Sequence, residues 1–326
     1  MITGGTGSFG TFFTNKLLEN QNFKHLKKII IYSRDELKQT EMAQKIDKKK
    51  LDKVRFFIGD VRDRDRLNRA TEDVDIVIHA AALKHVPIAE NNPFEFIKTN
   101  VLGSQNIIEA ALNSNVKKVI ALSTDKASSP INLYGATKLC SEKLFVSANN
   151  IKGNKKISFS VVRYGNVMGS RGSVIPFFLK QHSKKEKLSL THKDMTRFNI
   201  TLKEAIRLVT YSFSNCNDGE ILVPKIPSFK IIDLIASITS NNDFKVTGIR
   251  PGEKIHEELI NSYEAKNTLE LKNYYVILPT NNNKEINKYC KKNSAKKVAE
   301  SFCYTSKNNK DYLNISGLKQ LIKNNF

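Results

Sequence analysis

The chain has 326 residues, of which 40% are hydrophobic and 26% are charged, a balance that is typical of globular proteins and excludes a mainly disordered chain. The length suggests about two domains. The formal net charge is +21, but the lysines are spread along the chain and do not alternate with aromatic residues. We therefore expect a basic surface suited to anionic ligands and no nucleic-acid-binding face.

Cysteine and hydropathy patterns narrow the class of protein further. Cys140, Cys216, Cys290 and Cys303 lack the close spacing of disulfide frameworks or metal sites, and the chain has no signal peptide. We therefore expect free thiols in a reducing cytoplasm, and no metal. No apolar run approaches the roughly 20 residues of a membrane span, so we expect no membrane association.

A Gly-rich turn opens the chain and precedes a predicted helix over residues 11–20, whose apolar face would hold Phe12, Phe13, Leu17 and Leu18. Glycines permit a tight turn and let backbone amides at a helix N-terminus approach a pyrophosphate. A flexible turn is the simpler alternative. The candidate cofactor-binding residues of this segment are Gly4, Thr6, Gly7, Ser8, Phe9 and Gly10.

The next predicted strand, residues 28–32, completes a βαβ unit and leads into Ser33 and Arg34. In such units the end of this strand meets the adenosine ribose, where an acidic residue favours a free 2′-hydroxyl and an arginine favours a 2′-phosphate. Ser33 and Arg34 precede Asp35, so the sequence predicts NADP as the cofactor, with NAD as the alternative.

Two more strands are predicted over 54–58 and 74–79. Asp60, after the first of them, could bind the adenine amino group or cap its own turn. His79 is expected to be a buried, hydrogen-bonded histidine and not a catalyst. The alanines that follow it would leave room for a flat cofactor, and a helical crossover is predicted over 89–115. The remaining candidate cofactor-binding residues are Val61, Ala80, Ala81, Ala82, Lys84 and Asn100.

A fifth predicted strand delivers Thr124, Asp125 and Lys126 to the carboxyl edge of the sheet, where open α/β sheets bind their ligands. Tyr134 and Lys138 follow, one helical turn apart. An adjacent ammonium favours phenolate, so we expect Lys138 to lower the pKa of Tyr134 towards neutrality. An ordinary solvated helix face is the alternative.

The alternation of strands and helices, which ends with strands over 119–122 and 157–163, predicts a Rossmann-like, doubly wound parallel α/β sheet. After residue 167 the pattern changes. The elements predicted there are a strand over 219–224, helices over 231–239 and 316–323, and a loop over 281–284.

The motifs at both ends of this region resemble a known superfamily. Thr3-Gly4-x-x-Gly7-x-x-Gly10 and Tyr134-x-x-x-Lys138 together resemble the extended short-chain dehydrogenases/reductases. Further motifs, with Asp125-Lys126 the most discriminating pair, resemble the inverting UDP-N-acetylglucosamine 4,6-dehydratases, which make the first intermediate of pseudaminic acid for flagellin glycosylation. These motifs lie at 124–127, 132–138, 163–167, 170–173, 195–198 and 250–254, and the resemblance covers essentially the whole chain.

The resemblance implies a redox-neutral removal of water from UDP-N-acetylglucosamine with NADP. Tyr134 would take the proton of the 4-hydroxyl, which Thr124 orients, and Lys138 would hold the cofactor ribose. Lys126 would remove the proton at C5 while Asp125 protonates the departing 6-hydroxyl. Lys126 must then be neutral, so we expect its pKa to be lowered. The implied substrate-binding residues are Lys84, Asn166, Arg171, Val174, Arg197, Arg250 and Glu253.

The resemblance also implies two domains and a homo-oligomer. The dinucleotide-binding domain would span 1–167, together with about 202–230, and a smaller C-terminal substrate-binding domain would span 168–201 and 231–326. Members of the family carry several residues before the Gly-rich turn, whereas only Ile2 and Thr3 separate Met1 from Gly4 here. We expect a truncated sequence or a misassigned start, with a shortened central first strand that costs several kcal/mol.

Two alternative functions remain open. A 4-epimerase or a retaining dehydratase of the same superfamily would use Tyr134 and Lys138 without needing a base at Lys126. A non-catalytic regulator that only binds a dinucleotide is the alternative of another class, and the intact Thr124, Tyr134 and Lys138 argue against it.

Overall fold

The computed structural model describes residues 1–20, 23, 25–170, 172–239 and 243–325. The chain divides into two compact units. Unit 1 contains Met1–Ser123, Thr137–Val162 and Leu208–Ile221, and unit 2 contains Thr124–Ala136, Arg163–Arg207 and Leu222–Phe326. The domain boundaries expected from the sequence stay a prediction.

Unit 1 is built on a parallel sheet with the strand order β6-β5-β4-β1-β2-β3. Neighbouring strands from β5 to β3 pair in parallel. The strands are nearly continuous apolar runs, as expected for a parallel sheet covered on both faces. The predicted Rossmann-like sheet is confirmed. Its strands are β1 (Ile2–Thr3), β2 (Ile29–Ser33), β3 (Val54–Ile58), β4 (Ile76–His79), β5 (Lys118–Thr124) and β6 (Ser158–Tyr164).

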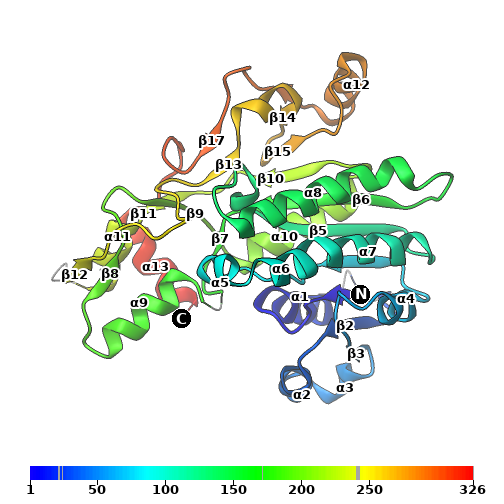
Figure 1. Cartoon of the computed structure of the whole chain (residues 1–326), viewed down its shortest axis with the longest axis horizontal. Helices are drawn as coiled ribbons and strands as arrows, with labels where there is room; N and C mark the ends of the chain where they lie inside the picture. The colour runs from blue at the N-terminus through cyan, green and yellow to red at the C-terminus, as the bar shows by residue number, and fades with distance from the viewer. Residues whose placement is uncertain (21–22, 24, 171, 240–242, 326) are drawn as a thin grey trace. The chain divides into compact units, whose positions relative to one another are not determined.

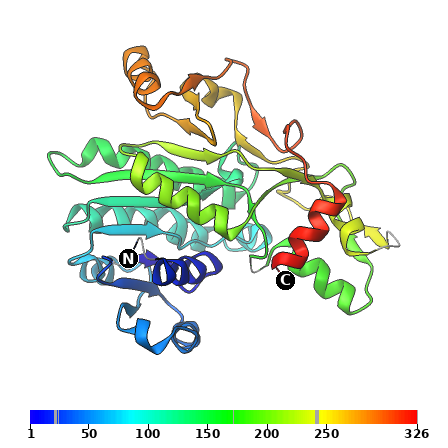
Figure 2. The same cartoon turned by 180° about the vertical axis from the view of Figure 1, so that it is seen from behind.

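Helices cover both faces of this sheet. Figure 1 shows α7 and α8 in front of it, and the view from behind in Figure 2 shows α1 and α10 on the opposite face. The predicted crossover over 89–115 is helical but broken, with a π-helical turn, η2, before α7. The helical segments of unit 1 are α1 (Ser8–Glu19), α2 (Glu36–Lys45), α3 (Lys48–Leu51), α4 (Arg64–Thr71), α5 (Val86–Asn91), α6 (Pro93–Phe96), η2 (Ile97–Leu102), α7 (Gly103–Leu112), and most of α8 (Leu133–Ile151) and α10 (Leu202–Asn215).

Two local features of unit 1 bear on the predictions. The short first strand is confirmed as β1, which is central, and Ile2 lies opposite Ile31 on one side and Ile78 on the other. The predicted apolar face of α1 is only partly right. The helix begins earlier than expected and buries Phe9 and Phe13, whereas Phe12 and its C-terminal leucines are partly exposed.

The described residues of unit 2 form small sheets and the helices α9, α11, α12 and α13. In the sheet that contains β10, the neighbouring strands follow in the order β10-β15-β14-β16. A second sheet has the order β11-β9-β7, and the pairs β12-β8 and β13-β17 each form a two-stranded sheet. The strands are β7 (Asn166–Val167), β8 (Leu188–Leu190), β9 (Thr196–Ile200), β10 (Ile221–Pro224), β11 (Ser228–Lys230), β12 (Phe244–Val246), β13 (Glu258–Ile260), β14 (Thr268–Glu270), β15 (Tyr274–Ile277), β16 (Lys296–Lys297) and β17 (Tyr304–Thr305).

The core of unit 2 includes the contact between three helices, α9 (Val174–Ser183), α11 (Ile231–Ile238) and α13 (Ile315–Asn325), through Phe178, Leu234 and Leu318. They lie side by side in both views (Figures 1 and 2). Short 3₁₀ turns, η3 (Asp125–Ala127) and η4 (Ser262–Asn267), complete the elements near the site.

The loop predicted over 281–284 is wrong in its second half. Helix α12 spans Asn283–Asn293, and the side chain of Asn282 accepts a hydrogen bond from Lys284 N. The run of asparagines indicates a loop by composition, but one of them is the N-cap of a helix that buries Ile286. No helix in the described part of the chain is long and apolar enough to cross a membrane.

Candidate active site

The Gly-rich turn of unit 1 fits an anionic cofactor. Gly7 is the N-cap of α1, no side chain caps that end, and the first turn carries no acidic residue. Gly4 has a positive φ of 63°, and a Cβ there would lie 2.9 Å from the backbone of Ala81. The turn therefore packs against the loop after β4 and leaves the N-terminus of α1 open to a pyrophosphate. The predicted residues Gly4, Thr6, Gly7, Ser8, Phe9 and Gly10 gather here.

The ends of β2 and β3 carry the charged residues expected near the ribose. Arg34 is half-exposed, and its Nη1 lies 3.4 Å from Asp60 Oδ2. The Asp35 carboxylate caps α2 by accepting a hydrogen bond from Lys38 N at 3.0 Å, whereas the buried Ser33 hydroxyl accepts one from Gln39 Nε2 at 3.0 Å.

Asp60 has the turn role that the sequence left open. Its Oδ1 accepts a hydrogen bond from Arg62 N at 3.0 Å, and its Oδ2 lies 2.7 Å from Arg62 Nη2. Burial alone would raise the pKa of Asp60, but Arg62 and Arg34 hold it below its usual value. Its contact with adenine stays a prediction.

Asn100 fixes the loop that follows β4. Its side-chain amide donates to Leu83 O at 2.9 Å and to Thr137 Oγ1 at 3.0 Å, and its oxygen accepts from Leu83 N at 2.8 Å. These bonds hold the loop that carries the predicted cofactor residues Ala80, Ala81, Ala82 and Lys84. The nearby Val61 is buried against Gly103, where an added Cβ would lie 2.8 Å from Val61 Cγ2.

His79 has the structural role expected of it. It is buried in unit 1, with Nδ1 2.8 Å from Thr3 Oγ1 and Nε2 3.4 Å from Ser104 Oγ. Burial, with a smaller effect of Lys138, lowers its pKa to about 3. Thr3 Oγ1 also accepts a hydrogen bond from Ala81 N at 3.3 Å, so the histidine supports the loop that carries the alanines.

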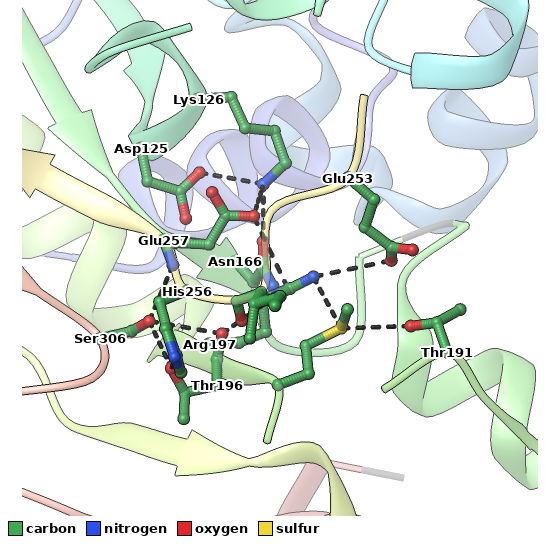
Figure 3. Close-up of polar contacts among 12 residues, drawn as sticks. Asp125, Lys126, Asn166, Thr191, Thr196, Arg197, Glu253, His256, Glu257 and Ser306 are labelled. Atoms are coloured by element: carbon green, nitrogen blue, oxygen red, sulfur yellow. Dashed lines mark hydrogen bonds and ion pairs between the residues drawn. The ribbon is translucent and has the colours of Figure 1, made fainter. Parts of the chain in front are cut away.

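Unit 2 brings Lys126 together with two carboxylates (Figure 3). Lys126 Nζ lies 3.0 Å from Asp125 Oδ1, 3.2 Å from Glu257 Oε1 and 3.4 Å from Asn166 Oδ1. Burial alone would lower the pKa of Lys126, but Asp125 and Glu257 raise it. The expectation of a lowered pKa is therefore wrong for this structure, where Lys126 is a stable cation.

Asp125 is the most deeply buried carboxyl of this group. Its Oδ1 accepts hydrogen bonds from Thr124 Oγ1 at 2.9 Å and from Lys126 Nζ, whereas Oδ2 has no hydrogen-bond partner within the described residues. Burial raises its pKa, and the charge of Lys126 opposes this only in part. A carboxyl in such a position can hold a proton at neutral pH and later donate it.

Tyr134 and Lys138 lie one turn apart on α8, as predicted. Burial raises the pKa of Tyr134 to about 12, opposed by the charge of Lys126 and a hydrogen bond with Thr124. Lys138 Nζ donates to Leu122 O at 2.8 Å, and burial lowers its pKa to about 8. The expectation that Lys138 brings the phenol close to neutrality is wrong here, because burial outweighs the nearby positive charges.

A glycine explains why Tyr134 lies so near Lys126. An added Cβ at Gly135 would lie 2.2 Å from Lys126 O, so the first turn of α8 can approach η3 only with glycine at this position. The Asn132 side chain caps the same turn by accepting a hydrogen bond from Gly135 N at 2.8 Å.

The predicted diphosphate-binding arginines differ in burial and in their partners. Arg197 is buried, and its guanidinium donates to Thr196 O at 2.7 Å and Ile255 O at 3.0 Å. Arg250 is exposed and pairs with Glu253 at 3.1 Å. Arg171 lies outside the described residues. Of the other predicted substrate residues, Val174 packs against the hydrophobic cluster between α9, α11 and α13, and Asn166 lies beside Lys126.

Glu257 is the residue of this site that sequence reasoning missed. It lies just before β13, is 2% exposed, and pairs with both Lys126 and Arg197. A single glutamate close after the Arg-Pro-Gly-Glu motif carries no periodic signal, because its partners come from segments far away in the sequence. Among the described residues, no group of His, Cys, Asp and Glu side chains could hold a metal ion, and the four cysteines are free.

Known proteins resemble this chain over most of its length. The model of the polysaccharide biosynthesis protein family matches residues 1–279. The Campylobacter jejuni (serotype O:2) protein named UDP-N-acetylglucosamine 4,6-dehydratase (inverting) is 54% identical, covering 95% of this chain and 92% of that protein. The protein of Rickettsia bellii named UDP-glucose 4-epimerase is 42% identical, covering 99% and 95%.

A solved structure agrees with these relatives. The crystal structure of Pen from Bacillus thuringiensis superimposes with a TM-score of 0.87 at 36% identity, covering 99% of this chain and 96% of that one. The fold, the Gly-rich turn, and Tyr134 and Lys138 on α8 agree with these similarities. The chain belongs to the polysaccharide biosynthesis protein family, within the extended short-chain dehydrogenases/reductases.

Proposed function

We propose that the chain is an NADP-dependent, inverting UDP-N-acetylglucosamine 4,6-dehydratase whose product is a UDP-4-keto-6-deoxy sugar of the L-arabino series. The observation that carries the proposal is the ion pair between the buried Asp125 and the part-buried Lys126 beside Tyr134. Together the three residues supply an acid, a base and a phenol. The name of the 54% identical Campylobacter relative supports the same substrate and the same inversion.

The residues of unit 1 fit a dinucleotide. The open N-terminus of α1 would bind the pyrophosphate, and Lys138 would hold the ribose next to the nicotinamide. The choice of NADP is supported by Arg34, which is exposed, and by Asp35, whose carboxylate caps α2. When bound, the nicotinamide supplies a hydride acceptor for C4 and a hydride donor for C6.

The first half of the reaction would need Tyr134 and Thr124. Tyr134 would take the proton of the 4-hydroxyl as C4 is oxidised, while the Thr124 hydroxyl orients the same group. With its pKa at about 12 in this structure, Tyr134 is protonated near neutral pH, so it acts only when the phenolate is stabilised in the substrate complex.

The second half would need Lys126 and Asp125. A 4-ketone acidifies the proton at C5, which Lys126 would remove, and Asp125 would give its proton to the 6-oxygen as water leaves. The free Oδ2 of Asp125 is the oxygen from which that proton would come. Protonation of C5 from the opposite face would invert this centre. Lys126 must first lose its own proton, because it is a cation in the structure.

A second candidate is a 4-epimerase, which the name of the 42% identical Rickettsia relative favours. An epimerase would use Thr124, Tyr134 and Lys138 to oxidise and reduce C4, and it would leave the 6-hydroxyl in place. Asp125 and Lys126 would then only hold the local structure.

The deciding experiment follows UDP-N-acetylglucosamine by NMR with the full chain and NADP in deuterated water. We expect a product with a C6 methyl group, solvent deuterium at C5 and the L-arabino configuration. Retention at C5 would favour a retaining dehydratase, and a C4 epimer with an intact 6-hydroxyl would favour the epimerase. A bound but unchanged substrate would favour the non-catalytic regulator.

The cellular role is proposed with the activity. We propose that the product enters pseudaminic acid synthesis for flagellin glycosylation, that the protein is cytoplasmic, in keeping with its free thiols, and that it is a homo-oligomer, as the family resemblance implies. Light scattering of the purified protein tests the oligomer, and a monomer at all concentrations would reject it.

A further inference from the structure

Five ionisable side chains lie close together in unit 2 (Figure 3). The cations Lys126 and Arg197 face the carboxyls of Asp125, Glu253 and Glu257. Asp125 and Glu257 are almost fully buried. Asp125 and Glu257 both pair with Lys126, and two buried carboxylates that lie this close to each other favour the binding of one proton between them.

The contacts indicate which carboxyl holds that proton. Glu257 pairs with both cations, at 3.2 Å from Lys126 Nζ and 3.6 Å from Arg197 Nε. Glu253 pairs with Arg197 at 3.6 Å and with the exposed Arg250 at 3.1 Å. Asp125 pairs with Lys126 alone; among the described residues one oxygen of each buried carboxyl, Oδ2 of Asp125 and Oε2 of Glu257, has no hydrogen-bond partner, so the number of cations distinguishes the two. The least compensated carboxyl is therefore Asp125.

The backbone fixes Glu257 in this position. Glu257 N donates to Ser306 Oγ at 2.9 Å, and Ser306 N donates to Glu257 O at 2.8 Å. Ser306 Oγ lies 2.7 Å from Thr196 Oγ1, next to Arg197. These bonds flank the pairing of β13 with β17. The distance from Glu257 to Lys126 is thus set by rigid neighbours and not by a flexible surface side chain.

We propose that Glu257 is a positioning residue of the proposed dehydration: before the reaction its negative charge keeps Asp125 protonated, and as the reaction begins it accepts the proton of Lys126, so that an acid and a base become available together. This inference rests on the proposed function. Burial alone would raise the pKa of Glu257, but Lys126 and Arg197 lower it, whereas the pKa of Asp125 is raised.

The proton balance of the step is complete. The proton on Lys126 Nζ passes to Glu257 Oε1, which converts an ion pair into a neutral pair without changing the net charge of the group. The free amine then removes the C5 proton of the 4-keto sugar, and Asp125 gives its proton to the 6-oxygen, which leaves as water. A substrate that excludes water from the group favours the neutral pair, because separated charges cost more in a low dielectric.

Other charged or titratable groups also face Glu257. Lys254 is part-buried, donates to Ser128 O at 2.8 Å and contributes to the lowered pKa of Glu257. The phenol of Tyr134 stays neutral, with its pKa raised to about 12 by burial. Neither replaces Glu257 as the partner of Lys126 in the contacts above.

The test is Glu257→Gln, which keeps the shape and removes the charge. The matched control is Glu258→Gln, one residue further, where the carboxylate accepts a hydrogen bond from Ser129 and an amide oxygen could do the same. For Glu257→Gln we expect dehydration to fall about 100-fold or more, the size of one acid–base contribution. Reduction of bound NADP by UDP-N-acetylglucosamine should persist, with KM little changed. The control should dehydrate at the wild-type rate.

The pH profile separates this role from a merely structural one. Without the negative charge of Glu257, Asp125 should lose its proton at lower pH. The decrease of the dehydration rate at high pH, the alkaline limb of the pH profile, should therefore begin at lower pH in Glu257→Gln. In Glu257→Asp, which keeps the charge, the pH of this alkaline limb should not change. If Glu257→Gln fails to fold, a shifted limb in Glu257→Asp would by itself overturn the proposal.

Other outcomes are also decisive. Dehydration by Glu257→Gln at the wild-type rate would overturn the inference while leaving the proposed function intact. An equal loss of cofactor reduction and dehydration, with no shift of the limb, would show a structural role. If the wild-type protein itself does not dehydrate UDP-N-acetylglucosamine, the proposed function fails, and this inference fails with it.

Discussion

Replacing His79 tests the electrostatics of the parallel sheet in unit 1. The ring is buried, and its pKa is lowered from 6.5 to about 3. Between these two pH values His79 is neutral in the folded protein but positively charged in the unfolded chain. The unfolded state therefore binds more protons between these two values. Stability that is present at neutral pH is lost as the pH falls through 6.5 towards 3.

The size of this effect follows from the two pKa values. Between about pH 7 and about pH 5, a group that titrates at 6.5 in the unfolded chain and near 3 in the native protein costs about 2 kcal/mol of stability. His79→Asn leaves an amide that can still contact Thr3, at a cost of about 2 kcal/mol at pH 7 for the lost ring atoms. The variant should thus be less stable than wild type at pH 7 and nearly equal to it at pH 5.

Urea unfolding at several pH values and constant ionic strength measures the difference between variant and wild type. Carboxylates that titrate in the same range cancel, because both proteins carry them. His182→Asn, on the exposed surface of α9, makes the same chemical change outside the buried sheet and serves as the matched control for the substitution. A His79→Asn difference that stays constant from pH 7 to pH 5 would refute the reasoning.

Three further predictions concern the proposed reaction. Tyr134→Phe should almost abolish turnover while UDP-N-acetylglucosamine still binds by calorimetry, and near-normal turnover would remove Tyr134 from the mechanism. Arg34→Ala should weaken NADP by about 1.5 to 3 kcal/mol and NAD much less, measured by titration, and an equal loss for both would reject the 2′-phosphate contact. Lys126→Ala should still reduce the bound cofactor slowly, seen by absorbance, but make almost no dehydrated product; product at the ordinary rate would exclude Lys126 as the base.

Much of unit 1 could be predicted because its signals are local. Apolar runs of strand length predicted β2, β3, β5 and β6 close to their observed bounds, and a Gly-rich turn before a helix predicted the open N-terminus of α1. The neighbouring positions of Asp125 and Lys126, and the single turn between Tyr134 and Lys138, are properties of the chain itself. The errors at α1 and α12 were local too, because the Gly-rich turn and the asparagines hid where each helix begins.

The amino-acid sequence by itself determined the parallel α/β sheet of unit 1, the family and the residue types available for proton transfer. Only the tertiary structure decided the protonation state of these residues. Lys126 is a cation because Asp125 and Glu257, the latter from a distant segment, outweigh the burial of its amine, and Tyr134 stays protonated because burial outweighs the nearby positive charge. A pKa depends on desolvation and on charges within a few ångströms, and these are set by segments that meet only when the chain folds.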